Sequence, residues 1–257
     1  MKIAVIGTGS YGIALGMMLA KNKNNKIMFW SHNEDTINYF NKNHRFELFD
    51  NVKIPNNIFI TNSYAEVMKD AKIIFFVTSA KYIKEISENI KKYYNNEPIC
   101  IASKGIDHNT LLPLSQLVKN ILKTNNISVI SGPTFAIDLI NNNPCALAIG
   151  GYSKKTINII KNNLENETLK LRISSDIIGI QLCGSIKNII AIAAGILKGL
   201  GCMESTESFL INESLHDLKN IIKSLGGKRK TILSFAGVGD IVLTCYSPKS
   251  RNYSFGY

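Results

Sequence analysis

The sequence holds few of the residues that would cross-link it or bind a structural metal. It has 5 cysteines and 4 histidines among 257 residues, the cysteines stand far apart, and no C-x-x-C pair occurs. This scarcity argues against a disulfide framework and against a zinc site. We therefore expect a protein of a reduced compartment, where thiols stay unpaired.

Segments that would direct the chain into or across a membrane are also lacking. We find no apolar run of the length that a membrane span needs. The opening stretch 1–6 runs directly into Gly7, so it is too short for a secretory signal peptide and lacks a cleavage region. The sequence thus predicts a cytoplasmic protein without a membrane span.

Positive charge exceeds negative charge, yet it forms no basic tail or stripe. Lys and Arg number 30 against 19 Asp and Glu, which gives a formal net charge of +11. The lysines are scattered among asparagines and isoleucines, and this pattern argues against a nucleic-acid partner. A basic surface still attracts anionic ligands, including phosphorylated metabolites and cofactors.

The sequence does contain an alternation of short β-branched runs and longer helical ones. Hydrophobic residues make up 45% of the chain, which is enough for one large domain or two moderate ones. Segments such as 13–20 and 82–90 carry apolar residues at three- and four-residue steps, as helices that cover a sheet do. The alternation predicts a parallel sheet with helices on both faces. The expected strands are 3–6, 27–30, 73–77, 99–102, 127–130 and 146–149.

A glycine motif follows the first expected strand directly. Residues 7–12, Gly-Thr-Gly-Ser-Tyr-Gly, fit G-x-G-x-x-G at the point where a helix opens. Gly7 permits a tight turn, Gly9 lets a pyrophosphate approach the backbone, and Gly12 allows close helix packing. The helix N-terminus offers its N–H groups to phosphates. We predict a Rossmann-type dinucleotide site, with a ligand-free turn as the alternative.

The pattern changes near Ser174, Ser175 and Asp176. These residues can cap a helix, an apolar helical run follows over 177–200, and no strand pattern appears after it. We expect an α/β protein with a Rossmann-type doubly wound sheet over 1–175 and an all-helical domain over 176–257.

The choice of cofactor depends on the end of the second strand. An NAD-selective site usually has Asp or Glu there to bind the ribose 2′-hydroxyl, but 30–33 contains no carboxylate. This absence favours NADP, with Ser31 and His32 near a 2′-phosphate, and dual use of NADP and NAD stays open. The later acids Glu34 and Asp35 fit the start of the next helix.

Five segments, in order, resemble the bacterial glycerol-3-phosphate dehydrogenase family over nearly the whole chain. The resemblance implies an NAD(P)-dependent enzyme that interconverts dihydroxyacetone phosphate and sn-glycerol 3-phosphate and supplies phospholipid synthesis. Hydride transfer to a ketone needs an acid and a positioned cofactor but no metal. The segments are 7–12, 102–105 (Ala-Ser-Lys-Gly), 131–136 (Ser-Gly-Pro-Thr-Phe-Ala), 181–188 (Gln-Leu-Cys-Gly-Ser-Ile-Lys-Asn), and 237–240 (Gly-Val-Gly-Asp) with 250–252 (Ser-Arg-Asn).

By this resemblance Lys187 is the acid/base of the reaction. A lysine ammonium near a carbonyl can polarise it and donate a proton to the developing alkoxide. Gly184 and Ala191 stand one turn on either side of Lys187 in an apolar run. This setting suits the role, because desolvation lowers the pKa of a lysine towards neutrality.

The other site residues, assigned by the resemblance, by the glycine motif or by their place after the second strand, form two groups. Arg251 presents a planar fork to phosphate oxygens, and Asp240 orients a substrate hydroxyl or holds Lys187 in position. The substrate group comprises Lys104, Gly132, Thr134, Asp240, Ser250, Arg251 and Asn252. The cofactor group comprises Gly7, Gly9, Ser10, Tyr11, Gly12, His32, Lys104, Ala136 and Arg251.

The sequence departs from the family pattern at two places. It ends at 254–257, whereas family members continue for several helices that include a cofactor contact. A truncated chain, a disordered or cleaved tail and a shortened gene product stay open as reasons. At 201–210 the family's glycine-rich turn is replaced, and Ser205 stands near an expected Asn, so we expect the contacts of this position to the catalytic region to be weakened. We expect cofactor binding to survive these changes more readily than full turnover.

Two other functions stay open. A dehydrogenase of the hydroxyacid type also pairs a Rossmann domain with a helical lysine domain, but it acts on carboxylates, which the Lys104 segment and the 250–252 cluster disfavour. A catalytically silent nucleotide-binding protein fits the short C-terminus. The expected partner is a small phosphorylated triose, and a homodimer is left open.

Overall fold

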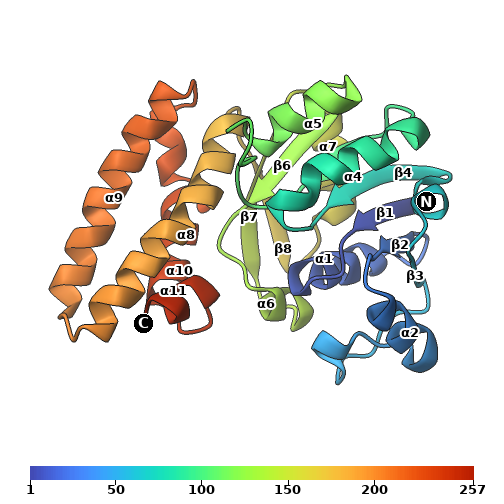
Figure 1. Ribbon diagram of the computed structural model, residues 1–257, viewed down its shortest axis with the longest axis horizontal. Helices are drawn as coiled ribbons and strands as arrows, with labels where there is room; N and C mark the ends of the chain where they lie inside the picture. Colours follow the sequence, from blue (N-terminus) through green and yellow to red (C-terminus); the bar gives the residue numbers. More distant parts are fainter.

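The structure, a computed structural model, describes residues 1–257 as a sheet-based part and a helical part that lie side by side (Figure 1). The sheet has eight strands in the order β3-β2-β1-β4-β5-β6-β7-β8. The predicted α/β class, a doubly wound sheet followed by helices, is confirmed. The strands are β1 (Lys2–Ile6), β2 (Lys26–Trp30), β3 (Ile58–Thr61), β4 (Ala71–Phe76), β5 (Ile99–Ile101), β6 (Ile127–Ser131), β7 (Cys145–Gly151) and β8 (Leu169–Ile173).

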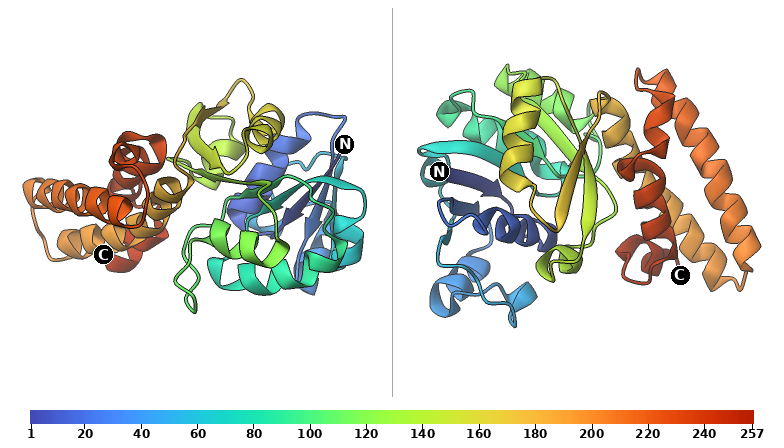
Figure 2. Two further views of the ribbon diagram at one scale, coloured as in Figure 1. Left: turned by 90° about the horizontal axis from the view of Figure 1, so that it is seen from above. Right: turned by 180° about the vertical axis from the view of Figure 1, so that it is seen from behind.

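Helices cover both faces of this sheet (Figure 2). Successive side chains of a strand point to opposite faces, so Ile3 and Val5 of β1 enter one hydrophobic core while Ala4 and Ile6 enter the other. The second of these cores continues into the helical part of the protein. The covering helices are α1 (Ser10–Ala20), α2 (Glu34–Asn43), α3 (Tyr64–Met68), α4 (Ile83–Ile90), α5 (Leu114–Leu122), α6 (Ala136–Ile140) and α7 (Lys154–Leu164).

The prediction of a wholly parallel sheet is wrong at β7, which runs antiparallel to β6. Apolar patterning shows that a strand is buried but does not encode its direction, and mixed sheets are common. The two outer strands, β3 and β8, were not expected from the sequence. β3 has only 4 residues, and β8 alternates buried leucines with exposed Lys170 and Arg172, a pattern that weakens the apolar signal of an edge strand.

The helical part follows β8 and begins with a capped helix. Asp176 is the N-cap residue of α8, and its carboxylate accepts hydrogen bonds from the Gly179 amide at 2.9 Å and the Thr231 hydroxyl at 2.5 Å. The caps predicted at 174–176 are thus confirmed. The helices of this part are α8 (Ile177–Gly199), α9 (Glu204–Ser224), α10 (Asp240–Tyr246) and α11 (Arg251–Gly256).

By length and composition, α8 is one helix that could cross a membrane, and this corrects the expectation that no run reaches that length. The polar Gln181 and Lys187 interrupt the run in the sequence and conceal its length. Within the fold, 61% of its most apolar window is buried inside the protein. A helix at the centre of a folded protein meets the same two criteria.

The direction of β7 and β8 decides where α8 crosses the sheet. Both strands end at the edge where β1 to β6 begin. α8 therefore starts at that edge, with Ile177 beside Gly150. It reaches the opposite, carboxyl edge at Gly184, where an added Cβ would lie 2.7 Å from the hydroxyl oxygen of Ser131 at the end of β6. One turn later Lys187 stands at the edge where open α/β sheets bind their ligands.

Candidate active site

The three glycines of the motif have different surroundings. Gly7 has a φ of +123°, which side-chain-bearing residues rarely adopt. A Cβ on Gly12 would lie 2.6 Å from the carbonyl oxygen of Gly7, so only glycine permits this approach of helix and turn. A Cβ on Gly9, in contrast, would meet nothing within 4 Å. The loop therefore leaves room at Gly9, where a pyrophosphate would approach the backbone.

The start of α1 is arranged to receive an anion. Gly9 is its N-cap residue and provides no side-chain cap, and the first intrahelical bond runs from the Ile13 amide to the Gly9 carbonyl. The N–H groups of Ser10, Tyr11 and Gly12 are thus left without helical partners. Helix N-termini of this kind bind phosphate groups.

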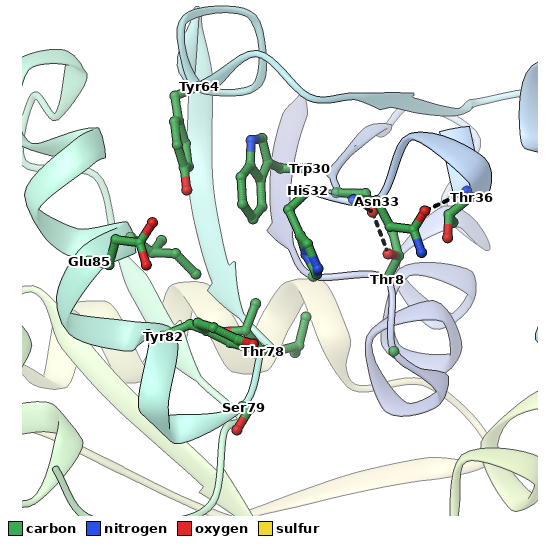
Figure 3. Close-up of a pocket in the computed structure, with 15 residues that line it drawn as sticks. Thr8, Trp30, His32, Asn33, Thr36, Tyr64, Thr78, Ser79, Tyr82 and Glu85 are labelled. Carbon is green, nitrogen blue, oxygen red and sulfur yellow. Dashed lines mark hydrogen bonds between the residues drawn. The ribbon is translucent and has the colours of Figure 1, made fainter. Parts of the chain in front are cut away.

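A cavity of about 420 Å³ opens beside the glycine loop (Figure 3), within the size range of ligand pockets. Trp30 at the end of β2 stacks on Tyr64 of α3 with ring centroids 4.4 Å apart. Tyr82 stands across from His32, with ring centroids 6.2 Å apart. Four of the 15 residues that line this cavity thus present flat rings, and we call it the aromatic cavity. Such rings fit a planar heterocycle such as a nucleotide base. Sequence reasoning missed Tyr64 and Tyr82, because they stand on separate segments, the start of α3 and the turn before α4, which meet only in the fold.

The rim of this cavity contains the residues considered for cofactor choice. The Ser31 hydroxyl lies 2.9 Å from that of Thr8 in the glycine loop. His32 is exposed and lines the cavity. Glu34 and Asp35 occupy the first turn of α2, as predicted, rather than the end of the strand. Glu85 of α4 lines the cavity as well.

Two lysines share one buried carboxylate between the sheet and the helical part. Lys187 of α8 donates to Oδ1 of Asp240 at 2.7 Å, and Lys104, which follows β5, donates to Oδ2 at 2.6 Å. Lys187 also donates to the hydroxyl of Thr244 at 2.6 Å. The structure thus brings together three predicted site residues and adds Thr244. The i, i+4 spacing of Asp240 and Thr244 on α10 was a signal that could have identified it.

Burial gives Lys187 an unusual acidity. The residue is 7% exposed, and desolvation together with the charge of Lys104 lowers the pKa of Lys187 from its ordinary value to about 8. Asp240 acts in the opposite direction and raises that pKa, but its effect is the smaller one. A lysine with a pKa near neutrality can both donate and accept a proton at physiological pH.

The loop after β6 faces the same place. Gly132 and Thr134 are buried, and Ala136 begins α6. The hydroxyl of Thr134 lies 2.9 Å from that of Tyr11, the residue after Ser10 in the glycine motif. Nothing in the sequence indicates this contact. It joins the predicted cofactor loop to the predicted substrate loop.

Ser131, at the end of β6, is another residue that sequence reasoning did not single out. It is 4% exposed, and its hydroxyl oxygen has no hydrogen-bond partner. Buried polar groups are nearly always paired. This unpaired hydroxyl lies at the carboxyl edge of the sheet, against Gly184 of α8. The contact between β6 and α8 is therefore a candidate ligand-binding position.

The predicted phosphate-binding cluster lies at the start of α11. Ser250 is the N-cap residue, accepting from the Tyr253 amide at 3.3 Å. Arg251 is exposed and has no hydrogen bond or ion pair within the protein. Asn252 donates to Asn188, the neighbour of Lys187, at 2.8 Å. The cluster is thereby tied to the helix that carries the buried lysine.

The second place where the sequence departs from the family pattern lies away from these residues. Ser205, in the first turn of α9, is exposed, and its side chain makes no hydrogen bond. The expectation that its contacts to the catalytic region are weakened stays a prediction.

Comparisons with known proteins agree over the length of the chain. Residues 2–157 match the N-terminal part of the NAD-dependent glycerol-3-phosphate dehydrogenase family, and residues 176–257 match its C-terminal part. The glycerol-3-phosphate dehydrogenase [NAD(P)+] of Orientia tsutsugamushi is 34% identical over 261 residues, covering 100% of this chain and 78% of the relative. That of Halothermothrix orenii is 33% identical, covering 99% and 75%.

Solved structures give the same result. The crystal structure of glycerol-3-phosphate dehydrogenase from Coxiella burnetii superposes with a TM-score of 0.95 at 29% identity, covering 99% of this chain and 78% of that one. The glycine loop, the aromatic cavity and the lysine pair thus occur in the fold of a two-part NAD(P)-dependent dehydrogenase, which is the class of this protein. Within that class, the chain belongs to the NAD-dependent glycerol-3-phosphate dehydrogenase family.

Proposed function

We propose that this protein interconverts dihydroxyacetone phosphate and sn-glycerol 3-phosphate by hydride transfer with NAD(P)H. The observation that carries this proposal is the buried lysine, Lys187, whose pKa is lowered to about 8 and which donates to Asp240. It stands at the carboxyl edge of the sheet, the same edge at which the glycine loop follows β1. An acid of that kind suits the protonation of an alkoxide. The product is a precursor suited to phospholipid synthesis.

The cofactor residues fit a dinucleotide in two places. Gly9, Ser10, Tyr11 and Gly12 provide free amides and open space for the pyrophosphate. The aromatic cavity that His32 lines receives the adenosine end. When bound, the nicotinamide supplies the hydride. Lys104 and Ala136 would stand at its other end, where the loops after β5 and β6 meet.

The chain's own groups handle the proton. In the reducing direction, Lys187 polarises the ketone oxygen and then gives its proton to the alkoxide; in the oxidising direction, neutral Lys187 takes that proton back. Asp240 holds the ammonium at 2.7 Å and balances the charge of Lys104. Thr244 accepts a second hydrogen bond from Lys187 and so fixes its direction.

The phosphate end of the substrate is assigned to the start of α11. The guanidinium of Arg251 has no partner within the protein, so both of its forked N–H pairs can meet phosphate oxygens. Asn252 and Ser250 stand beside it as neutral donors. Gly132 and Thr134, in the loop after β6, are assigned to the same substrate.

Within the NAD(P) class we favour NADPH. Ser31 and the exposed His32 follow β2, and the nearest carboxylates of that segment belong to α2. A 2′-phosphate would meet a hydroxyl and an imidazole there. Fluorescence titration with NADPH and NADH measures the preference. Tighter binding of NADH would reverse it and would assign the ribose 2′-hydroxyl to Glu85 on the cavity wall.

The other expectations belong to the same proposal. We assign the dinucleotide-binding domain to 1–175 and the catalytic helical domain to 176–257, consistent with the end of β8 at Ile173 and the start of α8 at Ile177. A cytoplasmic location and a homodimer are proposed with it, and size-exclusion chromatography with light scattering tests the latter.

A direct assay tests the reaction. The purified protein is mixed with dihydroxyacetone phosphate and NADPH, then NADH, and the absorbance of the reduced cofactor is followed. We expect oxidation of the cofactor that depends on the triose. Turnover of a β-hydroxy acid without turnover of the triose would instead favour the hydroxyacid class. Cofactor binding with no turnover of either would favour a silent nucleotide-binding protein.

A further inference from the structure

The contact between Tyr11 and Thr134 joins the two ligand loops across 123 positions of sequence. Their hydroxyl oxygens lie 2.9 Å apart, and the contact is partly buried. Tyr11 stands in the first turn of α1, and its own backbone N–H is among those assigned to the pyrophosphate. Thr134 stands in the loop after β6, where it was predicted to bind substrate. A single hydrogen bond thus connects the cofactor side of the cleft to its substrate side.

The surroundings of Thr134 place it close to the acid/base. Its neighbour Pro133 lies against Gly239, where an added Cβ would be 3.5 Å from the proline ring, and Gly239 directly precedes Asp240. The backbone amide of Thr134 donates to the Gly132 carbonyl at 2.9 Å, so the main chain of this turn is fixed. The hydrogen of the threonine hydroxyl can still rotate about the Cβ–Oγ1 bond.

Tyr11 is suited to set that rotation. Burial raises the pKa of the Tyr11 phenol, so the group stays protonated. A phenol is also the more acidic of the two hydroxyls and therefore the better donor. When it donates to Thr134, it uses one of the two lone pairs of the threonine oxygen, and the hydrogen of the threonine hydroxyl must point away from Tyr11. No other group of the protein accepts from that hydroxyl.

We propose that Tyr11 is a positioning residue for the substrate: it donates to the Thr134 hydroxyl and thereby directs the threonine hydrogen at an acceptor oxygen of the bound phosphorylated ketone. The inference rests on the proposed function. Phosphate and carbonyl oxygens are acceptors only, so they pair with a hydroxyl whose hydrogen is free. Hydroxyls in a chain also strengthen one another, because each donated bond polarises the next.

The test removes the phenolic oxygen and keeps the ring. We expect Tyr11→Phe to raise the KM for dihydroxyacetone phosphate about fivefold, the value of one ordinary hydrogen bond. The dissociation constant for NADPH, measured by fluorescence, should change less than about twofold, since the backbone amides and ring are unchanged. Thr134→Val should raise the same KM by a similar or larger factor, whereas Thr134→Ser, which retains a hydroxyl, should keep it low.

A double variant distinguishes positioning from a purely structural contact. In the Thr134→Val background, Tyr11→Phe should raise the KM no further, because the hydroxyl that it orients is gone. Tyr94→Phe is the matched control: Tyr94 donates to Thr124 at 3.1 Å in the same sheet-based part but far from the cleft. That variant should leave the KM at the wild-type value.

The outcomes separate this inference from the proposed function. A wild-type protein that neither binds nor reduces dihydroxyacetone phosphate would overturn both. A wild-type protein that reduces it, with Tyr11→Phe lowering the melting temperature but leaving the KM unchanged, would overturn only the role of Tyr11. If the KM of the double variant instead rises by the product of the two single-variant factors, Tyr11 and Thr134 act independently, and the positioning role of Tyr11 is likewise overturned.

Discussion

Lys187 and Asp240 form an ion pair of 2.7 Å in which the lysine side chain is 9% exposed and the carboxylate 1%. Removing either partner from such a pair leaves an uncompensated buried charge, which is costly. Here the second lysine, Lys104, shares the same carboxylate. The site thus holds two cations on one anion, an excess of positive charge at the place where an alkoxide or a phosphate would stand.

The first prediction concerns Lys187 itself. Lys187→Met keeps much of the apolar stem but removes the proton that the reaction needs, while Asp240 stays paired with Lys104. We expect kcat to fall by about 10³-fold or more, with NADPH affinity and the circular dichroism spectrum unchanged. Near-normal turnover would remove Lys187 from the mechanism.

The pH dependence follows from the lowered pKa of Lys187, about 8. Reduction needs the protonated amine, so its kcat should be constant below about pH 8 and fall above it. Oxidation needs the neutral amine, so its kcat should rise through the same range. Asp240 raises the pKa of Lys187. In Asp240→Asn, the pH at which the kcat for reduction falls and the pH at which the kcat for oxidation rises should therefore both be lower. Profiles that do not depend on Asp240 would contradict this account.

The next prediction tests the phosphate end. Arg251→Lys replaces a planar fork with a point charge, so we expect the KM for the triose phosphate to rise about tenfold while kcat changes little. Lys249→Arg, on the exposed turn two residues earlier, serves as a control for general surface charge. An unchanged KM in Arg251→Lys would detach this residue from the phosphate.

The glycine loop gives a prediction that separates folding from binding. The methyl group added in Gly9→Ala would have no atom within 4 Å, so the thermal stability should be unchanged. The same methyl group would occupy the space of the pyrophosphate, so NADPH binding should weaken at least tenfold. Gly12→Ala places a Cβ 2.6 Å from the Gly7 carbonyl and should lower the melting temperature. Calorimetry with cofactor titration measures the stability and the NADPH affinity of both variants. A loss of stability in Gly9→Ala would contradict the open space assigned to Gly9.

Much of the fold could be predicted from the sequence because its signals are local. The buried runs of β1, β2 and β4, the glycine turn and the caps before α8 each depend on neighbouring residues. Strand direction does not, and β7 was therefore assigned to a parallel sheet although it is antiparallel to β6. The four residues of β3 and the charged alternation of β8 gave too weak an apolar pattern to be seen as strands.

The site was predictable only in part, for the same reason. Lys187, Lys104 and Asp240 stand in segments that resemble a family, and the structure brings them within hydrogen-bond distance. Of the further contacts, only that of Thr244 has a local signal, its i, i+4 spacing from Asp240 on α10. The contact of Tyr11 with Thr134 spans 123 positions and has none. The roles of all these residues in binding and catalysis stay predictions until they are measured.

The course of α8, from one edge of the sheet to the other, limits which length changes the chain can tolerate. Each residue of an α-helix adds a rise of about 1.5 Å and a rotation of about 100°. Deleting a single residue between Ile177 and Lys187 would therefore swing the ammonium sideways, away from Asp240, even if the helix stayed intact. Insertions in the exposed turn between α8 and α9, where a Cβ on Gly201 would meet nothing within 4 Å, carry no such consequence, so length variation among natural homologues should be concentrated there.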